Sequence, residues 1–409
     1  MEVVHPRSGG LDVHQKTVVA AVRIAASRKV TRESKTFGTT TKELLALSDW
    51  LSSFGVTHVA MESTGVYWKP VWHVLDGAFE LVLANAMHIK NIPGRKSDVN
   101  DAVWISDLLA HGLIRGSFIP PAPIQELRDL TRNRKQLVRD AARYTQRLQK
   151  VLEDANIKLT EILSDVTGKS GRAILSALVT GEMDPEVLAD LVCGNRLKAT
   201  REELVEALRG RATSHHRFLL KLLLGQIDAL EAAVHELEVR MGEALAPFRE
   251  SVEHLKTIPG VSDAVARVIV AEVGLDMGRF PTSGHLISWA GLCPGMNESA
   301  GKRLSSRIRP GAPWLKSTLA QAAWAAIRTK GCYLRAQFHR IKSRRGPKKA
   351  IIAVAASMLT AAYYILKNHV PYRDLGFEHY DRIDKAKTAS RLVKKLINLG
   401  FDVALSPAA

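Results

Sequence analysis

The chain has 409 residues, enough for two or three domains with sizeable cores. Its formal net charge is +17 and its pI is about 9.8, so a polyanion such as nucleic acid is a more suitable partner than a neutral or basic one. The positive charge is also concentrated, because residues 299–373 contain 16 Lys or Arg and no Asp or Glu.

Composition excludes other classes of protein. The three cysteines lie far apart and form no CxxC pair, which argues against a zinc site and a disulfide framework: Cys193, Cys293 and Cys332. The N-terminus has no apolar signal core, and no segment approaches about 18 uninterrupted apolar residues. We therefore expect a soluble cytoplasmic protein with no membrane partner.

The first part of the chain predicts a mixed α/β domain over residues 8–122. Its expected elements are two strands over 10–24 with a tight turn at 14–16, a strand over 32–37, a helix over 41–54, a strand over 57–61, a helix over 66–79, a strand over 80–84 and a helix over 98–111. Three strands followed by alternating helix and strand is the order of an RNase H-like domain.

Heptads follow, and they predict a coiled-coil domain over residues 123–253. Apolar residues alternate at spacings of three and four from Leu127 to Val151 and again from Leu220 to Ala244. Residues of about 165–212 are helical but broken by glycines and prolines, which indicates an inserted subdomain. The first long helix also carries a basic stripe that faces either solvent or phosphate; its cations include Arg128, Arg132, Lys135, Arg139 and Arg143.

A third, mainly helical unit is expected over residues 254–373, followed by a charged tail over 374–409. Residues 255–273 contain Ile-Pro-Gly-Val between two short helices, the pattern of a helix-hairpin-helix. In that motif the turn, here at Gly260, presents backbone N–H groups to a phosphate, although an ordinary helix turn has the same pattern.

Four acidic residues carry the predicted chemistry. Asp12 stands at the centre of an apolar strand, Glu62 follows another, and Asp98 and Asp101 lie three apart at a helix start. Each of the last two has a structural alternative as a cap or first-turn residue. As a set, carboxylates at adjacent strand ends predict a site for Mg²⁺ or Mn²⁺ that supports phosphoryl transfer.

These residues lie in motifs that resemble a known family. Gly-Leu-Asp-Val-His-Gln-Lys, Met-Glu-Ser-Thr-Gly-Val-Tyr-Trp and Gly-Arg-Lys-Ser-Asp-Val-Asn-Asp-Ala are similar to those of the DEDD-type insertion-sequence transposases, the IS-one-ten family. The resemblance runs over residues of about 10–370. It implies a RuvC-like domain, a coiled coil and a small C-terminal transposase domain, with Asp12, Glu62, Asp98 and Asp101 as the metal tetrad.

The resemblance also implies a serine nucleophile. The stretch Trp-Ala-Gly-Leu-Cys-Pro-Gly-Met-Asn-Glu-Ser-Ala-Gly-Lys-Arg points to Ser299, with Ser305 and Ser306 as alternatives in a shifted register. A hydroxyl needs activation to attack phosphorus, and nearby cations stabilise the charge that develops. The expected cations are Lys302, Arg303, Arg307 and Arg309. Pro310 after Arg309 departs from the family pattern and leaves the local phosphate contacts open.

Partners follow from the same resemblance. It implies donor and target DNA, a structured non-coding bridge RNA that selects sequence by base pairing, and a homodimer or homotetramer in a prokaryotic cell, associated with the nucleoid when active. The alternative is a Holliday-junction resolvase-like endonuclease, which uses the same carboxylates with water and needs no Ser299. An actin-like sugar kinase lacks its second glycine-rich turn here, and a non-catalytic scaffold does not explain Asp12.

Overall fold

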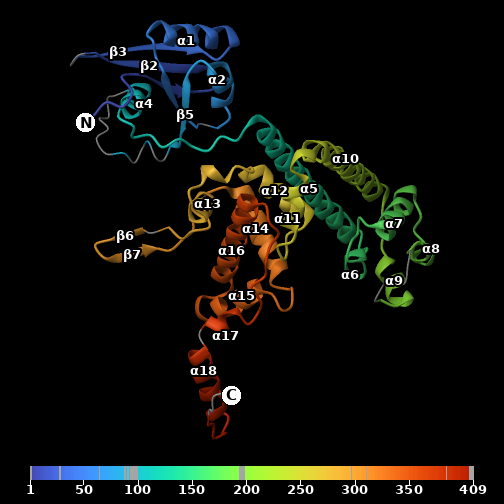
Figure 1. Ribbon diagram of the computed structural model, residues 1–409. Coiled ribbons are helices and arrows are strands. Elements are labelled where there is room, and N and C mark those ends of the chain that lie inside the picture. The colour runs from blue at the N-terminus through green and yellow to red at the C-terminus, as the bar shows by residue number, and fades with distance from the viewer. Residues whose placement is uncertain are drawn as a thin grey trace. The chain divides into compact units, whose positions relative to one another are not determined.

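The computed structural model describes residues 2–26, 29–63, 65–86, 89, 92, 100–192, 199–295, 297–309, 311–383 and 385–404. It divides into two compact units, Met1–Ile119 and Pro120–Ala409, which are considered separately (Figure 1).

The first unit is built on a five-stranded mixed sheet with the strand order β3-β2-β1-β4-β5. Its strands are β1 (Arg7–Val13), β2 (Thr17–Ala26), β3 (Lys29–Gly38), β4 (His58–Glu62) and β5 (Glu80–Ala84). The first three strands form an antiparallel meander, whereas β1, β4 and β5 run parallel. This order is compatible with the predicted RNase H-like fold.

Helices cover both faces of this sheet. One face packs against α1 (Thr41–Ser53) and α2 (Trp68–Leu75), and the other against α4 (Asp101–Ala110) (Figure 1). Leu11, Val13 and Met61 lie in the core with α1 and α2, while Ala60 contacts the core with α4. Side chains alternate between faces along a strand, so Asp12 and Glu62 belong to the α4 face.

Two predicted helices have different bounds. The second helix was expected to reach residue 79, but α2 ends at Leu75 because Asp76 is extended and Gly77 has φ +86°. The third was expected to begin at Asp98, but α4 begins at Asp101, where the side chain of Asn100 accepts from the Ala102 N–H. Asp98 itself lies outside the described residues.

Two long helices begin the second unit. They are α5 (Ala122–Asp154) and α10 (Ser214–Ala244), and they lie side by side (Figure 1). The Arg134 guanidinium crosses between them to the Glu238 carboxylate at 2.6 and 2.8 Å. In the described part of the segment between them, four short helices share one apolar core with their ends: α6 (Leu159–Ile162), α7 (Lys169–Thr180), α8 (Pro185–Asp190) and α9 (Arg201–Leu208).

The rest of the second unit is mainly helical. Its elements are η1 (Ala246–Phe248), α11 (Arg249–Lys256), α12 (Asp263–Val273), η2 (Met277–Arg279), α13 (Ser283–Trp289), β6 (Asn297–Ser299), β7 (Lys302–Ser305), α14 (Pro313–Ala326), α15 (Tyr333–Arg345), α16 (Pro347–Asn368), α17 (His379–Ile383) and α18 (Lys385–Ile397). The strands β6 and β7 form a hairpin between α13 and α14 (Figure 1).

One helix of the described residues is long and apolar enough to cross a membrane by composition. This is α16, and it packs against α11, α13, α14 and α15 with ten of its side chains buried. A core helix satisfies the same criterion, so α16 is weak evidence for a membrane span.

Candidate active site and nucleic-acid interface

Asp12 was expected at a strand centre, but β1 ends at Val13, so Asp12 and Glu62 lie at the same end of two adjacent parallel strands. The β1–β4 register pairs Leu11 with Met61, so the next position along each strand is Asp12 and Glu62. Both belong to the face that α4 covers. The Asp12 side chain is 21% exposed, and its Oδ2 lies 3.1 Å from Nε2 of His14. The two carboxylates therefore share one corner of the sheet.

The start of α4 is held close to the same strand. A Cβ on Gly10 would lie 2.1 Å from the Ala102 carbonyl oxygen and 2.4 Å from the Ser106 nitrogen, so only glycine permits this approach. The buried Ser8 hydroxyl donates to the Ser106 carbonyl oxygen at 3.1 Å. Asp101 is the first residue of α4, and the close approach of the two backbones brings it to the part of β1 that carries Asp12.

An ion-pair cluster that the sequence analysis missed fixes the other end of α4. Asp107 Oδ1 accepts from Arg23 Nε at 2.9 Å and from Arg32 Nη2 at 2.9 Å. Arg23 lies on β2, and its side chain is only 5% exposed. A buried charge is costly unless it is paired, so this cluster locks α4 to the sheet. The sequence did contain a sign of this ion pair, because Arg23 lies between Val22 and Ile24 in an otherwise apolar strand.

The donor chemistry at this corner fits a hard divalent cation. Carboxylate oxygens are the ligands that Mg²⁺ prefers, and Asp12, Glu62 and Asp101 carry side chains of this type. Among the described residues no group of three potential ligands is close enough to hold a metal ion as the side chains stand. The fourth expected ligand, Asp98, lies outside those residues.

Ser299 occupies the tip of the β6–β7 hairpin. It pairs with Lys302 in the strand register, and the two residues between them have φ +49° (Ala300) and +74° (Gly301). A two-residue turn with positive φ at both positions matches the twist of a hairpin. Ser299 is exposed, and a Cβ on Gly301 would meet nothing within 4 Å. The hydroxyl is therefore accessible to a large substrate.

The base of the hairpin is closed by two glycines. A Cβ on Gly291 would lie 2.8 Å from Gly311 Cα, and one on Gly311 would lie 2.5 Å from Gly291 Cα. Both have positive φ, +71° and +53°. Higher up, the Gly295 N–H donates to the Arg307 carbonyl oxygen at 2.7 Å. The chain can cross this tightly only without side chains at the two positions.

The hairpin also carries the predicted cations. Lys302, Arg307 and Arg309 are exposed, and the Arg309 carbonyl oxygen accepts from Lys316 Nζ at 2.9 Å. The side chain of Arg303 and the whole of Pro310 lie outside the described residues. Of the alternative serines, Ser305 uses its hydroxyl locally, because its Oγ accepts from the Arg307 N–H at 3.2 Å.

Gly260 lies in the turn between α11 and α12, with φ +81°. A Cβ there would lie 2.4 Å from the Ala322 carbonyl oxygen and 2.5 Å from the Ala326 nitrogen. The glycine therefore allows this turn to pack directly on α14, which by itself accounts for its presence.

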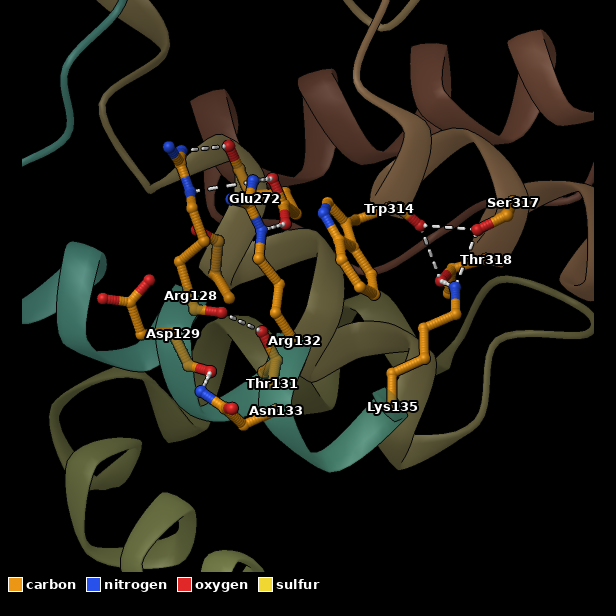
Figure 2. A network of polar contacts seen from close by, with 11 residues as sticks. Arg128, Asp129, Thr131, Arg132, Asn133, Lys135, Glu272, Trp314, Ser317 and Thr318 are labelled. Carbon is orange, nitrogen blue, oxygen red and sulfur yellow. Dashed lines mark hydrogen bonds and ion pairs between the residues drawn. The ribbon is translucent and has the colours of Figure 1, made fainter. Parts of the chain in front are cut away.

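Three cations of the basic stripe on α5 have partners within the same unit. Figure 2 shows the Arg132 guanidinium bound to both carboxylate oxygens of Glu272 at 2.8 and 2.9 Å. Arg128 Nη2 donates to the Glu272 carbonyl oxygen at 2.8 Å, and its Nε lies 3.6 Å from the carboxylate. Glu272 is 1% exposed. These charges are therefore neutralised inside the packing of α5 against α12.

Lys135 connects α5 to α14, next to the contact between α5 and α12. Its Nζ donates to the hydroxyls of Ser317 and Thr318 at 2.7 and 3.1 Å (Figure 2). Burial lowers the pKa of this ammonium, and Arg139 lowers it further. Burial likewise lowers the pKa of Arg128, while Glu272 opposes that effect.

The sequence left open whether this stripe faces solvent or phosphate, and three of its cations have partners inside the unit. The structure assigns Arg128, Arg132 and Lys135 to the packing of α5 against α12 and α14, because a buried acid and two hydroxyls satisfy them. Arg139 and Arg143 are exposed. Arg139 lies 5.6 Å from the Trp314 ring, and Arg143 pairs with Asp140.

Comparisons with known families agree with the motif order. Residues 9–157 match a family model for transposases of the DEDD IS110 type, and residues 252–339 match one for the transposase IS116/IS110/IS902 family. The chain belongs to the IS110 family of transposases. This confirms the family resemblance found in the sequence. A search of the curated proteins finds no match.

The two matches cover both candidate regions of this transposase. The first includes the five-stranded sheet and α5, and the second includes α11, α12, the β6–β7 hairpin and α14. A transposase acts on DNA, whose phosphates have the charge opposite to that of the exposed cations.

Proposed function

We propose that this transposase cuts and rejoins DNA with two sets of groups: a divalent-metal site at the corner of the sheet and the hydroxyl of Ser299. The observation that carries the proposal is the strand register, which continues from Leu11 and Met61 to Asp12 and Glu62 on the face that α4 covers. Neighbouring carboxylates repel each other, and a divalent cation offsets that repulsion.

Asp12, Glu62, Asp98 and Asp101 would hold Mg²⁺ or Mn²⁺. When bound, the metal supplies Lewis-acid stabilisation of the charge on phosphate oxygens. The first turn of α4 adds the positive end of a helix dipole next to Asp101, which steadies anionic ligands. His14 contacts Asp12 at 3.1 Å and fixes the orientation of that carboxylate.

Ser299 is the proposed nucleophile toward phosphorus. Its Oγ would form a bond to phosphorus while the bond to the departing DNA oxygen breaks, which leaves a serine–DNA phosphodiester. The exposed hairpin tip supports this assignment, because a hydroxyl that attacks duplex DNA must reach beyond the protein surface. Lys302, Arg303, Arg307 and Arg309 would stabilise the negative charge on the pentacovalent phosphorus.

Nucleic-acid binding would extend beyond the site. Arg139 and Arg143 on the solvent side of α5 are proposed to contact phosphates, and the α11–α12 turn at Gly260 to act as a helix-hairpin-helix. We also propose that α5 and α10 form a coiled coil within a domain of residues 123–253, between a RuvC-like domain of residues 8–122 and a transposase domain of residues 254–373, with a tail of 374–409. A bridge RNA as guide and a homodimer or homotetramer complete the proposal.

Ser299→Ala tests the nucleophile. The variant should fold normally but form no covalent protein–DNA product, which denaturing electrophoresis of a labelled substrate measures directly. Ser305→Ala and Ser306→Ala are the matched controls, and both should retain the covalent product. Undiminished metal-dependent nicking by Ser299→Ala would instead support the resolvase-like alternative, in which water is the nucleophile.

A further inference from the structure

A separate group of cations lies where α15 ends and α16 begins. Arg344, Arg345, Lys348 and Lys349, here called the basic corner, flank Gly346, and all four side chains are exposed. Gly346 has φ +79°, so the chain turns at this residue and α16 begins directly after it.

The basic corner has no neutralising neighbour within the part of the chain that the structure describes. Its four residues take part in none of the ion pairs found there, and residues 299–373 contain no Asp or Glu. Other cations of α15 differ, because Arg340 stacks 4.4 Å from the Tyr380 ring and Lys342 lies 5.9 Å from the Phe338 ring. The charge of the corner therefore remains available to an external anion.

The position of two lysines makes this charge unfavourable for folding. Lys348 and Lys349 lie in the first turn of α16, where the helix dipole is positive and repels cations. Gly346 offers no side-chain cap there. Arg344 and Arg345, at the end of α15, lie at the favourable end of their helix. Folding does not account for the two lysines, whereas a bound anion would pair with them and with the dipole.

The side chains around the basic corner indicate which kind of anionic partner it can bind. Residues 341–352 include no aromatic side chain, so bases of a single strand would find no stacking surface. Ala350 and Ile351 are buried and Ile352 is half-buried, so Pro347 is the one fully exposed apolar residue in the first two turns of α16, which is too little to insert into a lipid surface. Cations without either feature fit a regular array of phosphates.

We infer that the basic corner binds the sugar-phosphate backbone of duplex DNA. This inference rests on the proposed function and adds a contact surface outside the carboxylates, the hairpin and α5. It is a sequence-independent contact, which positions the duplex but does not select its sequence.

Lys348→Gln/Lys349→Gln in the full chain tests the inference. Each phosphate contact contributes about 0.9 to the slope of log affinity against log salt, so the variant should lose about 1.8. Its affinity deficit for a random-sequence duplex should therefore shrink about 12-fold between 50 and 200 mM salt. Fluorescence anisotropy measures both quantities. The melting temperature should not fall, because repulsion by the α16 dipole is removed.

Lys169→Gln/Lys221→Gln is the matched control. It removes the same charge from exposed positions on α7 and α10 and should leave the slope unchanged. An unchanged slope in the Lys348→Gln/Lys349→Gln variant would overturn the inference. So would a loss confined to double-stranded RNA or to anionic vesicles, both measured in the same buffer.

Asp12→Asn separates this inference from the proposed function. That variant should bind duplex DNA with the wild-type salt slope but not cleave it. If Asp12→Asn cleaves normally, the proposed function fails regardless of the corner. If it is inactive and the lysine variant binds like wild type, only the basic corner is wrong.

Discussion

Carboxylates occur in two different settings in this transposase. Glu272 on α12 and Asp107 on α4 each contact two arginines, and Glu272 is 1% exposed. Asp12 and Glu62 instead lie beside each other at the ends of β1 and β4, and the side chain that contacts Asp12 is a histidine and not an arginine. A carboxylate that is paired with arginine stabilises the packing of helices and strands. Two adjacent carboxylates repel each other, and a bound cation offsets that repulsion.

The largest effect is expected when the charge of Asp12 is removed. Asp12→Asn should reduce strand cleavage at least ~1,000-fold, because metal-based charge stabilisation supplies several kcal/mol to phosphoryl transfer. The unfolding free energy should stay the same or rise slightly, since one repelling charge is removed. Cleavage assays and denaturant titrations measure the two effects. Asp49→Asn, on the exposed side of α1, is the control and should change neither.

Glu272 should show the opposite pattern. Glu272→Gln leaves Arg128 and Arg132 without their anion, so the protein should lose about 3 kcal/mol of stability. Cleavage measured well below the new melting temperature should stay within a few-fold of wild type. Calorimetry provides the test, and a change of less than about 0.5 kcal/mol would show that the ion pair does not hold α5 to α12.

Arg23 should act on the proposed metal site indirectly, because its ion pair with Asp107 supports α4, which begins at Asp101. Arg23→Gln should raise the Mg²⁺ concentration for half-maximal cleavage by about 10- to 100-fold, the range found when groups that orient metal ligands are removed. The maximal rate at saturating Mg²⁺ should recover to within a few-fold. Arg32 is 44% exposed and shares the same carboxylate, so Arg32→Gln should cause a smaller shift. Equal loss at all metal concentrations would point to misfolding instead.

The smallest effect is expected on the solvent side of α5. Arg139→Gln should weaken duplex DNA binding a few-fold and lower the salt slope by about 0.9, with no change in melting temperature. Arg132→Gln, two turns earlier on the same face of α5 and paired with Glu272, should lower stability and leave the salt slope unchanged. If Arg132→Gln lowered the salt slope and Arg139→Gln lowered only the stability, Arg132 would be the DNA contact and Arg139 the packing residue.

Local patterns were sufficient to predict the sheet region. Alternation in β1, the short apolar run of β4 and the apolar spacing of α1 specify these elements through contacts close in sequence, and the observed strand order is compatible with the predicted fold. The start of α4 was placed three residues early, because an aspartate at a helix start reads as a cap and the actual cap is Asn100.

Long-range partners were beyond sequence reasoning. The stripe on α5 has helical periodicity in the sequence, but Glu272, which neutralises part of it, lies 140 residues away. The hairpin at Ser299 was also missed. Its turn uses Ala300 at φ +49°, and alanine rarely adopts that conformation, so no Asn-Gly or Asp-Gly signal marked it. The role of Ser299 came from family resemblance and stays a prediction.

Because the backbones of Gly291 and Gly311 cross at the base of the hairpin, the segment between them can change in length independently of the helices on either side. Since the backbones meet at the base and the turn at Gly301 projects into open space, changes in length at the turn need not propagate into α13 or α14. Related chains, or engineered ones, can thus vary how far the tip extends while retaining the same helical support. A bulky residue at either glycine would instead force the two chain segments apart.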